Sequence, residues 1–199
     1  ETAPPAVEES GSWENTAQLL HSYSDGAHLE AKHFTFESPF VPVLDQLADY
    51  AAVSFTPGRR HLEATLDLTR RIFTEFKFDA TATCVNTPPL EVLHKRRGVC
   101  QDFAHLMIGC LRSLGLSARY VSGYLLTVPP PGKPRLAGAD VSHAWVSVYF
   151  PEFGWLDFDP TNNCIPSGHH ITLGWGRDYG DICPIKGVFI GGGHHAMHV

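Results

Sequence analysis

Residues 96–105 read Arg-Arg-Gly-Val-Cys-Gln-Asp-Phe-Ala-His, and this stretch decides the fold because a helix breaker gives way there to a helical run. Between Phe103 and Leu114 apolar residues recur at helical spacing, and no proline interrupts them. Gly98 precedes this run, so the pattern predicts a helix that begins within a residue or two of Cys100.

A thiol at that place meets the unpaired N–H groups of the first helical turn and the positive end of the helix dipole. Both favour the thiolate, which is the nucleophilic form of cysteine. The position of Cys100 therefore suits a catalytic cysteine. The alternative is a small buried apolar residue, which is how most free cysteines behave.

A nucleophile of this kind needs a base, and the base needs a group that orients it. Residues 145–150 are rich in β-branched and aromatic side chains and predict a strand, and residues 155–159 predict an antiparallel strand that returns after a turn. This hairpin brings His143 and Asp159 to the same open end, within reach of a hydrogen bond. Asp157 shares the parity of Asp159, so spacing alone leaves both carboxylates open.

Several motifs follow one another in a characteristic order. They are Gly-Val-Cys-Gln-Asp-Phe-Ala-His at 98–105, Ala-Arg-Tyr-Val-Ser-Gly-Tyr at 118–124, His-Ala-Trp at 143–145, Trp155, Asp-Pro-Thr at 159–161 and Gly-Arg-Asp-Tyr-Gly-Asp at 176–181. Together they resemble the transglutaminase-like superfamily, and more narrowly the bacterial members described as transglutaminase-like enzymes or cysteine proteases. The resemblance runs from about Pro57 nearly to the C-terminus.

The resemblance implies a Cys-His-Asp triad with Cys100 as nucleophile, His143 as general base and acid, and Asp159 as the orienting carboxylate. It favours Asp159 over Asp157 because the family motif is the Asp-Pro-Thr aspartate. It also implies an α+β, papain-like fold, in which the helix that bears the nucleophile packs on an antiparallel sheet.

Other residues near these motifs receive weaker predictions. The backbone N–H of Cys100 is the first expected donor to an oxyanion; the neighbouring Gln101 and Asp102 are expected to complete or support that site. Asp102 and His105 lie three residues apart on the helix, where a structural role is favoured over a rival catalytic pair. Trp145 and Trp175 adjoin the motifs and are candidates for the substrate cleft, with core packing as the alternative.

The composition narrows the function classes. The chain has 199 residues, 43% of them hydrophobic, and a formal net charge of −6, which argues against a nucleic-acid partner. It shows no apolar run long enough to span a bilayer, so no membrane partner is expected. Five scattered cysteines argue against a disulfide framework and for a reducing, cytoplasmic compartment.

Metal binding is the weaker hypothesis for the histidine pairs. His169 and His170, and the later His194, His195 and His198, lack the ordered spacing with cysteines or a carboxylate that zinc sites usually show. Asp178 and Asp181 lack the loop spacing of a calcium site. The sequence therefore predicts no metal and no other cofactor.

The pattern along the chain predicts two parts. Residues 1–40 show no sustained period and are expected to be a tail or the remnant of a preceding module; residues 41–199 form the transglutaminase-like catalytic domain. Helices are predicted at 43–55, 59–76, 90–95 and from about 100, and strands at 118–127, 144–150 and 155–159.

The function expected from these features is thiol-dependent acyl transfer on peptide or glutamine-type amides through a thioester. Hydrolysis, as in a protease or amidase, is favoured over cross-linking by a protein-glutamine gamma-glutamyltransferase, because the bacterial relatives are commonly described as proteases. The partner is then a protein or peptide substrate. A catalytically silent binding module of the same fold is the alternative from another class.

Overall fold

The computed structural model of the chain describes residues 4–22, 26–126 and 141–183. Its helices are η1 (Val7–Glu9), α1 (Trp13–Ser22), α2 (Gly26–Lys32), η2 (His33–Thr35), α3 (Asp45–Ala52), α4 (His61–Glu75), α5 (Pro89–Lys95) and α6 (Cys100–Ser113), where η marks a 3-10 helix. Its strands are β1 (Lys77–Phe78), β2 (Arg97–Gly98), β3 (Ala118–Leu125), β4 (Val141–Phe150), β5 (Gly154–Phe158) and β6 (His170–Gly176). None of the helices in these ranges is long and apolar enough to cross a membrane.

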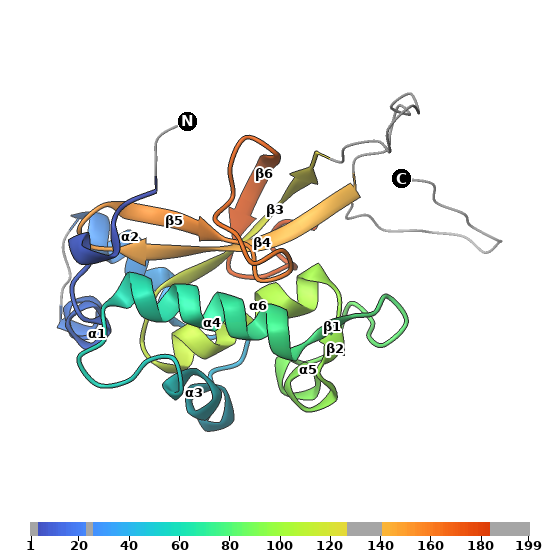
Figure 1. Cartoon of the computed structure of the whole chain (residues 1–199), viewed down its shortest axis with the longest axis horizontal. Coiled ribbons are helices and arrows are strands. Elements are labelled where there is room, and N and C mark those ends of the chain that lie inside the picture. The colour runs from blue at the N-terminus through green and yellow to red at the C-terminus, as the bar shows by residue number, and fades with distance from the viewer. Residues whose placement is uncertain (1–3, 23–25, 127–140, 184–199) are drawn as a thin grey trace.

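The longer strands form an antiparallel sheet in the order β5-β4-β3-β6, and α3 to α6 gather on one of its faces (Figure 1). The register pairs Tyr120 on β3 with Val146 on β4, and Val146 with Phe158 on β5. These three side chains are buried and belong to the hydrophobic core beneath the sheet. Alternation along the strands therefore supplies one apolar face for the helices.

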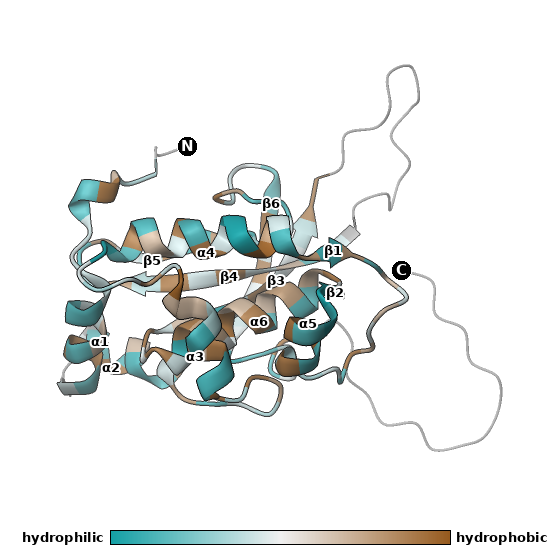
Figure 2. Cartoon of the chain, turned by 60° about the horizontal axis from the view of Figure 1, so that its bottom comes forward, coloured by the Kyte–Doolittle hydropathy of each residue, from teal (hydrophilic) through white to brown (hydrophobic). Residues whose placement is uncertain are grey.

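Helix α6 lies at the centre of the helical layer, where it contacts β3, β4, α3, α4 and α5. Every residue from Asp102 to Arg112 is buried. A helix that is apolar around most of its circumference is stable only when it is covered on all sides. Figure 2 shows this difference: hydrophobic colour runs along α6, whereas α4 carries alternating stripes.

The predicted central elements are present, with ends that differ by a few residues. Strand β6 was not predicted, because Gly174 and Gly176 interrupt its pattern and glycine usually weakens a strand. The structure accommodates these glycines by an irregularity in the β3–β6 register, between Ser122 and Gly123. The histidines at 194, 195 and 198, which were considered above as metal ligands, lie outside the described residues.

The described residues among the first forty fold onto the rest of the chain. Helices α1 and α2 pack onto it, and Leu20 and Ala31 are buried. The hydroxyl of Ser117 donates to the carbonyl oxygen of Ala31 (2.7 Å), and Arg60 Nη1 donates to the carbonyl oxygen of Ser10 (2.6 Å). The division of the chain near residue 40, into a tail or the remnant of a preceding module and a catalytic domain, stays a prediction.

Arg112, near the end of α6, connects several of these segments. Its buried guanidinium donates to the carbonyl oxygens of Phe34 (3.0 Å), Ala118 (2.9 Å) and Arg177 (2.6 Å), and to the hydroxyl of Ser38 (3.1 Å). Burial lowers the pKa of Arg112 to about 10, so the group remains a cation at neutral pH. One side chain thus holds the N-terminal segment, the sheet and the turn after β6 together.

Arg112→Met should destabilise the protein by roughly 3 kcal/mol or more, since several buried carbonyl oxygens would lose their donor. Urea unfolding followed by circular dichroism measures this loss. The matched control is Arg70→Met, because Arg70 has a mostly exposed side chain paired with Asp67 and its loss should cost less than about 1 kcal/mol. Equal losses in both variants would contradict the role given to Arg112.

His61, at the start of α4, is a fully buried imidazole whose two nitrogens have no hydrogen-bond partner among the described residues. Its ring packs against Phe150 at a centroid distance of 4.3 Å. Burial lowers the pKa of His61 to about 3. The folded protein therefore keeps this ring neutral at pH values where the unfolded chain would protonate it.

His61→Leu should flatten the acid side of the stability curve. In the wild type, acidification from about pH 6.5 to about pH 3 protonates His61 in the unfolded chain but not in the folded protein. His61 therefore lowers the free energy of unfolding by roughly 1 kcal/mol for each pH unit in this range. Urea unfolding at several pH values measures the slope, with the exposed His94→Gln as control. A slope that His61→Leu leaves unchanged would show that another group causes the acid sensitivity.

Candidate functional site

Cys100 is the first residue of α6 and is half-buried. The helix begins there because Val99 has extended backbone angles and because the side chain of Asp102 turns back to the chain entry. Asp102 Oδ2 accepts a hydrogen bond from the N–H of Val99 (2.7 Å), as an acidic residue in a first helical turn commonly does. The sulfur therefore lies at the positive end of the helix, as the sequence predicted.

Asp102 also ties the helix start to the preceding loop. Its Oδ2 accepts a hydrogen bond from the Thr83 hydroxyl (2.6 Å). Burial raises the pKa of Asp102 and outweighs the opposing effect of its bonds to Thr83 and Val99. Gly98 leaves room for this carboxylate: a Cβ at that position would lie 2.6 Å from Asp102 Oδ2. The predicted supporting role of Asp102 thus has a structural basis.

Gln101 points toward the same loop. Its Nε2 donates to the carbonyl oxygen of Val85 (2.9 Å), so its amide is occupied in this structure. A hollow of about 210 Å³ lies beside these residues and is lined by Gln101, Asp102, Val99 and the loop from Ala80 to Val85. This hollow borders the first turn of α6.

His143 on β4 and Asp159, one residue after β5, form a short hydrogen bond. The distance between His143 Nε2 and Asp159 Oδ2 is 2.7 Å, and both side chains are buried. The second oxygen, Oδ1, accepts hydrogen bonds from the backbone N–H groups of Thr161 (2.9 Å) and Asn162 (3.1 Å). The turn that follows β5 therefore fixes the carboxylate that faces the imidazole.

Asp157, the alternative carboxylate, has a different partner. Its Oδ2 accepts a hydrogen bond from Trp145 Nε1 (2.9 Å). The structure thus resolves what spacing left open: Asp159 lies against His143, and Asp157 pairs with the indole.

The thiol of Cys100 is close enough to His143 to help raise the pKa of that ring, so thiol, imidazole and carboxylate lie together at this end of the helix. Because His143 Nε2 faces Asp159, Nδ1 is the ring nitrogen left for the thiol. Burial lowers the pKa of His143, but the hydrogen bonds and charges of Asp159 and Cys100 outweigh it and raise the value to about 9. For Asp159 burial raises the pKa, and the contacts with His143, Asn162 and His170 outweigh it and lower the value to about 2.

Two residues that the sequence did not indicate also contact Asp159. Asn162 Nδ2 lies 2.7 Å from Asp159 Oδ2 and 3.3 Å from His143 Nε2. His170, the first residue of β6, places its Nε2 3.0 Å from the same oxygen. His170 was considered only as a zinc ligand, because the strand that carries it was not predicted. Asn162 follows the Asp-Pro-Thr motif directly, and that adjacency was its one signal.

The tryptophans predicted for the substrate cleft occupy different surroundings. Trp145 is fully buried, and its ring lies 6.0 Å from the ring of His143 and 5.2 Å from that of His170. It backs both imidazoles and has no accessible surface for a substrate, so the cleft prediction is wrong for this residue in the structure. Trp175 is 52% exposed and stacks on the guanidinium of Arg119 at 4.5 Å.

His105 and Cys110, the other residues of α6 considered above, contact the fold and not the candidate triad. His105 does not pair with Asp102; it accepts a hydrogen bond from the N–H of Tyr179 (3.1 Å) and stacks on Phe40. Cys110 is buried in the core, as predicted.

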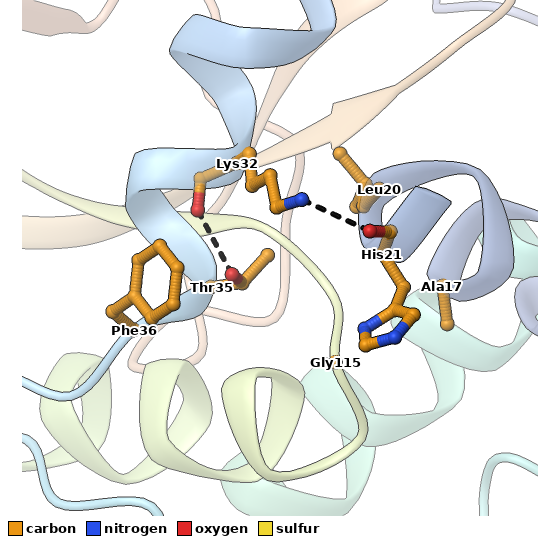
Figure 3. Close-up of a pocket in the computed structure, with 7 residues that line it drawn as sticks. All are labelled: Ala17, Leu20, His21, Lys32, Thr35, Phe36 and Gly115. Carbon is orange, nitrogen blue, oxygen red and sulfur yellow. Dashed lines mark hydrogen bonds between the residues drawn. The ribbon is translucent and has the colours of Figure 1, made fainter. Parts of the chain in front are cut away.

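A second hollow lies at the opposite end of α6, next to Gly115 (Figure 3). Around it, Lys32 Nζ donates to the carbonyl oxygen of His21 (2.9 Å), and the Thr35 hydroxyl donates to the carbonyl oxygen of Lys32 (2.8 Å). Its lining residues include neither the thiol nor the imidazole and carboxylate described above. This hollow is therefore separate from the cluster of Cys100, His143 and Asp159.

Among the described residues, one group of side chains has the donor types and spacing to hold a metal ion. The ligand atoms of His143, Asp159 and His170 all lie within 4.8 Å of one another. In the structure these atoms bond to each other, so the same three residues form a hydrogen-bonded cluster. Together with Cys100 they can supply a nucleophile, a proton carrier and an orienting charge.

Known proteins with similar sequences come from several bacteria. The chain is 47% identical over 162 residues to an uncharacterised protein of Mycobacterium tuberculosis, covering 79% of this chain and 52% of that protein. The chain thus spans about half the length of this relative. It is also 40% identical over 72 residues to the protein-glutamine gamma-glutamyltransferase of Pseudomonas aeruginosa, covering 36% of this chain and 11% of that enzyme.

A solved structure from Cytophaga hutchinsonii, described as that of a candidate cysteine protease, superposes with a TM-score of 0.66 at 28% identity, covering 80% of this chain and 50% of that one. This likeness confirms the predicted α+β, papain-like class. The family model of the transglutaminase-like superfamily matches residues 49–160, which include Cys100, His143 and Asp159. Since the match covers more than half of its residues, the chain belongs to the transglutaminase-like superfamily.

Proposed function

We propose that the protein is a thiol-dependent acyl-transfer enzyme that acts on peptide or glutamine-type amides, with Cys100, His143 and Asp159 as its catalytic triad. The observation that carries the proposal is the juxtaposition of Cys100, at the first residue of α6, with His143, whose imidazole is hydrogen-bonded to Asp159. A binding module of this fold would need none of these contacts, whereas a nucleophile, its base and the group that orients the base need all of them.

The first step is proton transfer from the thiol to His143. The charge of Asp159 stabilises the resulting imidazolium, and the helix N-terminus favours the thiolate. Because the pKa of His143 is about 9, the ring holds this proton at neutral pH. The attacking form is the thiolate beside the protonated imidazole.

The thiolate then attacks the amide carbon. A carbon–sulfur bond forms, the carbonyl oxygen becomes an oxyanion, and the backbone N–H of Cys100 at the helix start donates to that oxygen. Collapse breaks the carbon–nitrogen bond, and His143 gives its proton to the departing amine. In the second half His143 takes a proton from water, whose oxygen attacks the thioester carbon. The carbon–sulfur bond then breaks, which releases the carboxylic acid and leaves the thiolate beside the protonated His143 for the next cycle.

The triad serves hydrolysis and transfer equally, since water and an amine attack the same thioester. We favour hydrolysis, as in a protease or amidase, because the solved structure that superposes with a TM-score of 0.66 over 80% of the chain is described as a candidate cysteine protease. The relative named as a gamma-glutamyltransferase matches a shorter segment and supports the second candidate, transfer to an amine.

Iodoacetamide should alkylate Cys100 selectively at about pH 6, where ordinary thiols are mostly protonated. Cys84 is the internal reference, because it is exposed and because hydrogen bonds with Thr87 and Asn86 lower its pKa, which makes it a demanding comparison. We expect Cys100 to react at least roughly tenfold faster than Cys84, with Cys100→Ala removing the fast phase. Peptide mapping by mass spectrometry identifies each site. Labelling of Cys84 alone would contradict an activated Cys100.

A peptide-library digest with Cys100→Ala as control tests the reaction itself. Wild-type cleavage that the variant lacks supports hydrolysis. Incorporation of an added primary amine into a glutamine peptide, without cleavage, would favour the transfer alternative. Neither reaction over a broad peptide set, despite selective alkylation of Cys100, would contradict the amide substrate class.

Asp159→Asn should lower kcat by roughly 10²- to 10⁴-fold, because the imidazole loses the charge that orients and stabilises it. Since Asp159 raises the pKa of His143, the variant should also shift the alkaline limb of kcat/KM to lower pH. The matched control is Asp157→Asn, which keeps an oxygen acceptor for Trp145 and should leave the limb in place. Equal pH profiles for wild type and Asp159→Asn would contradict the proposed role.

A further inference from the structure

His170 is a buried imidazole at the site whose role the triad mechanism does not use. Its side chain is 6% exposed, and its Nε2 lies 3.0 Å from Asp159 Oδ2, the same oxygen that contacts His143 at 2.7 Å. One carboxylate oxygen therefore lies between two imidazoles. This inference rests on the proposed function of the triad and deepens it.

Only one ring nitrogen of His170 has a hydrogen-bond partner among the described residues. Nδ1 is buried and has none, whereas Nε2 faces Asp159 Oδ2. A carboxylate oxygen can only accept a hydrogen bond. His170 therefore donates its Nε2–H to Asp159.

The donors around Asp159 compete for its charge. Oδ2 lies near nitrogens of His143 (2.7 Å), Asn162 (2.7 Å) and His170 (3.0 Å), and Oδ1 accepts from the N–H groups of Thr161 and Asn162. Three N–H groups thus share the lone pairs of one oxygen. Each donor that is present draws on the negative charge that stabilises the His143 imidazolium.

We propose that His170 is a positioning residue that shares the Asp159 carboxylate with His143 and so limits how strongly His143 holds its proton. The consequence concerns the second half of the reaction, in which His143 must act as a base toward water. A general base works best when its pKa lies close to the pH at which the enzyme works. His143 thus stays basic enough to take the proton of the thiol. By sharing Asp159, His170 also keeps His143 from holding that proton so tightly that the ring cannot act as a base toward water.

Metal binding by the same residues is the rival explanation, since the ligand atoms of His143, Asp159 and His170 lie within 4.8 Å of one another. The hydrogen bonds favour the positioning role, because both oxygens of Asp159 are already occupied by N–H donors. A metal would have to displace the His143–Asp159 hydrogen bond. Titration with Co²⁺, followed by visible absorption, distinguishes the two explanations.

The test uses His170→Phe, which keeps the aromatic ring and removes the donor, and His170→Gln, which keeps an N–H donor. The matched control is His169→Phe on the exposed neighbouring residue. Proton–nitrogen NMR of histidine-labelled protein, with His143→Gln to identify the signals of that ring, gives the pKa of His143 without any substrate. Steady-state kinetics on a cleaved peptide gives kcat and the alkaline limb of kcat/KM.

We expect His170→Phe to raise the pKa of His143 by about half a unit or more, to move the alkaline limb upward, and to lower kcat roughly tenfold. This shift is opposite to that of Asp159→Asn. His170→Gln should restore most of the wild-type behaviour, and His169→Phe should match the wild type. A merely structural role would lower stability or kcat without raising the pKa of His143.

An unchanged or lowered pKa of His143 in folded His170→Phe would overturn the inference. Co²⁺ absorption at stoichiometric metal that disappears in His170→Phe would overturn it in favour of a metal ligand. These failures are separate from failure of the proposed function, which would appear as absent selective alkylation of Cys100 in the wild type. If His170→Phe does not fold, His170→Leu replaces it in the same measurements.

Discussion

The packing of helix α6 on strand β4 is the contact on which the site depends. The thiol comes from the first residue of the helix and the imidazole from the strand, and their encounter is fixed by the core between them. Ala104 on the helix and Ala144 on the strand are both buried in that core, which packs the two elements against each other. Because close-packed interiors transmit displacement, a shift in this core would change the distance between sulfur and ring.

The sequence contained enough information for the elements whose patterns are strong. Helix α6 and the β4–β5 hairpin have regular apolar periods and clear breakers, and the structure has them close to the predicted bounds. Strand β6 was missed because its glycines and exposed apolar residues resemble a loop. Helices α1 and α2 were missed because they are short, and much of their stability comes from packing onto other elements, which no local pattern reveals.

The candidate site divides in the same way. Cys100, His143 and Asp159 could be named in advance, because a motif or a hairpin places each of them. His170 could not be named in advance, since its contact with Asp159 depends on strand β6. That strand was not predicted, and it pairs with β3 at the opposite edge of the sheet from β5. Trp145 was misread for a related reason. Its position beside His143 in sequence suggested a surface, whereas the sheet buries it behind the imidazole.

Gly98 limits which residues evolution can place just before the nucleophile helix. Any side chain there would collide with Asp102, whose carboxylate joins the start of the nucleophile helix to Thr83. The three atoms nearest to a side chain at position 98 all belong to Asp102, and none belongs to the loop from Ala80 to Val85. That loop lines the hollow beside the start of α6. Divergence in substrate preference among related proteins is therefore expected to accumulate in that loop, while the glycine two residues before the cysteine stays under purifying selection.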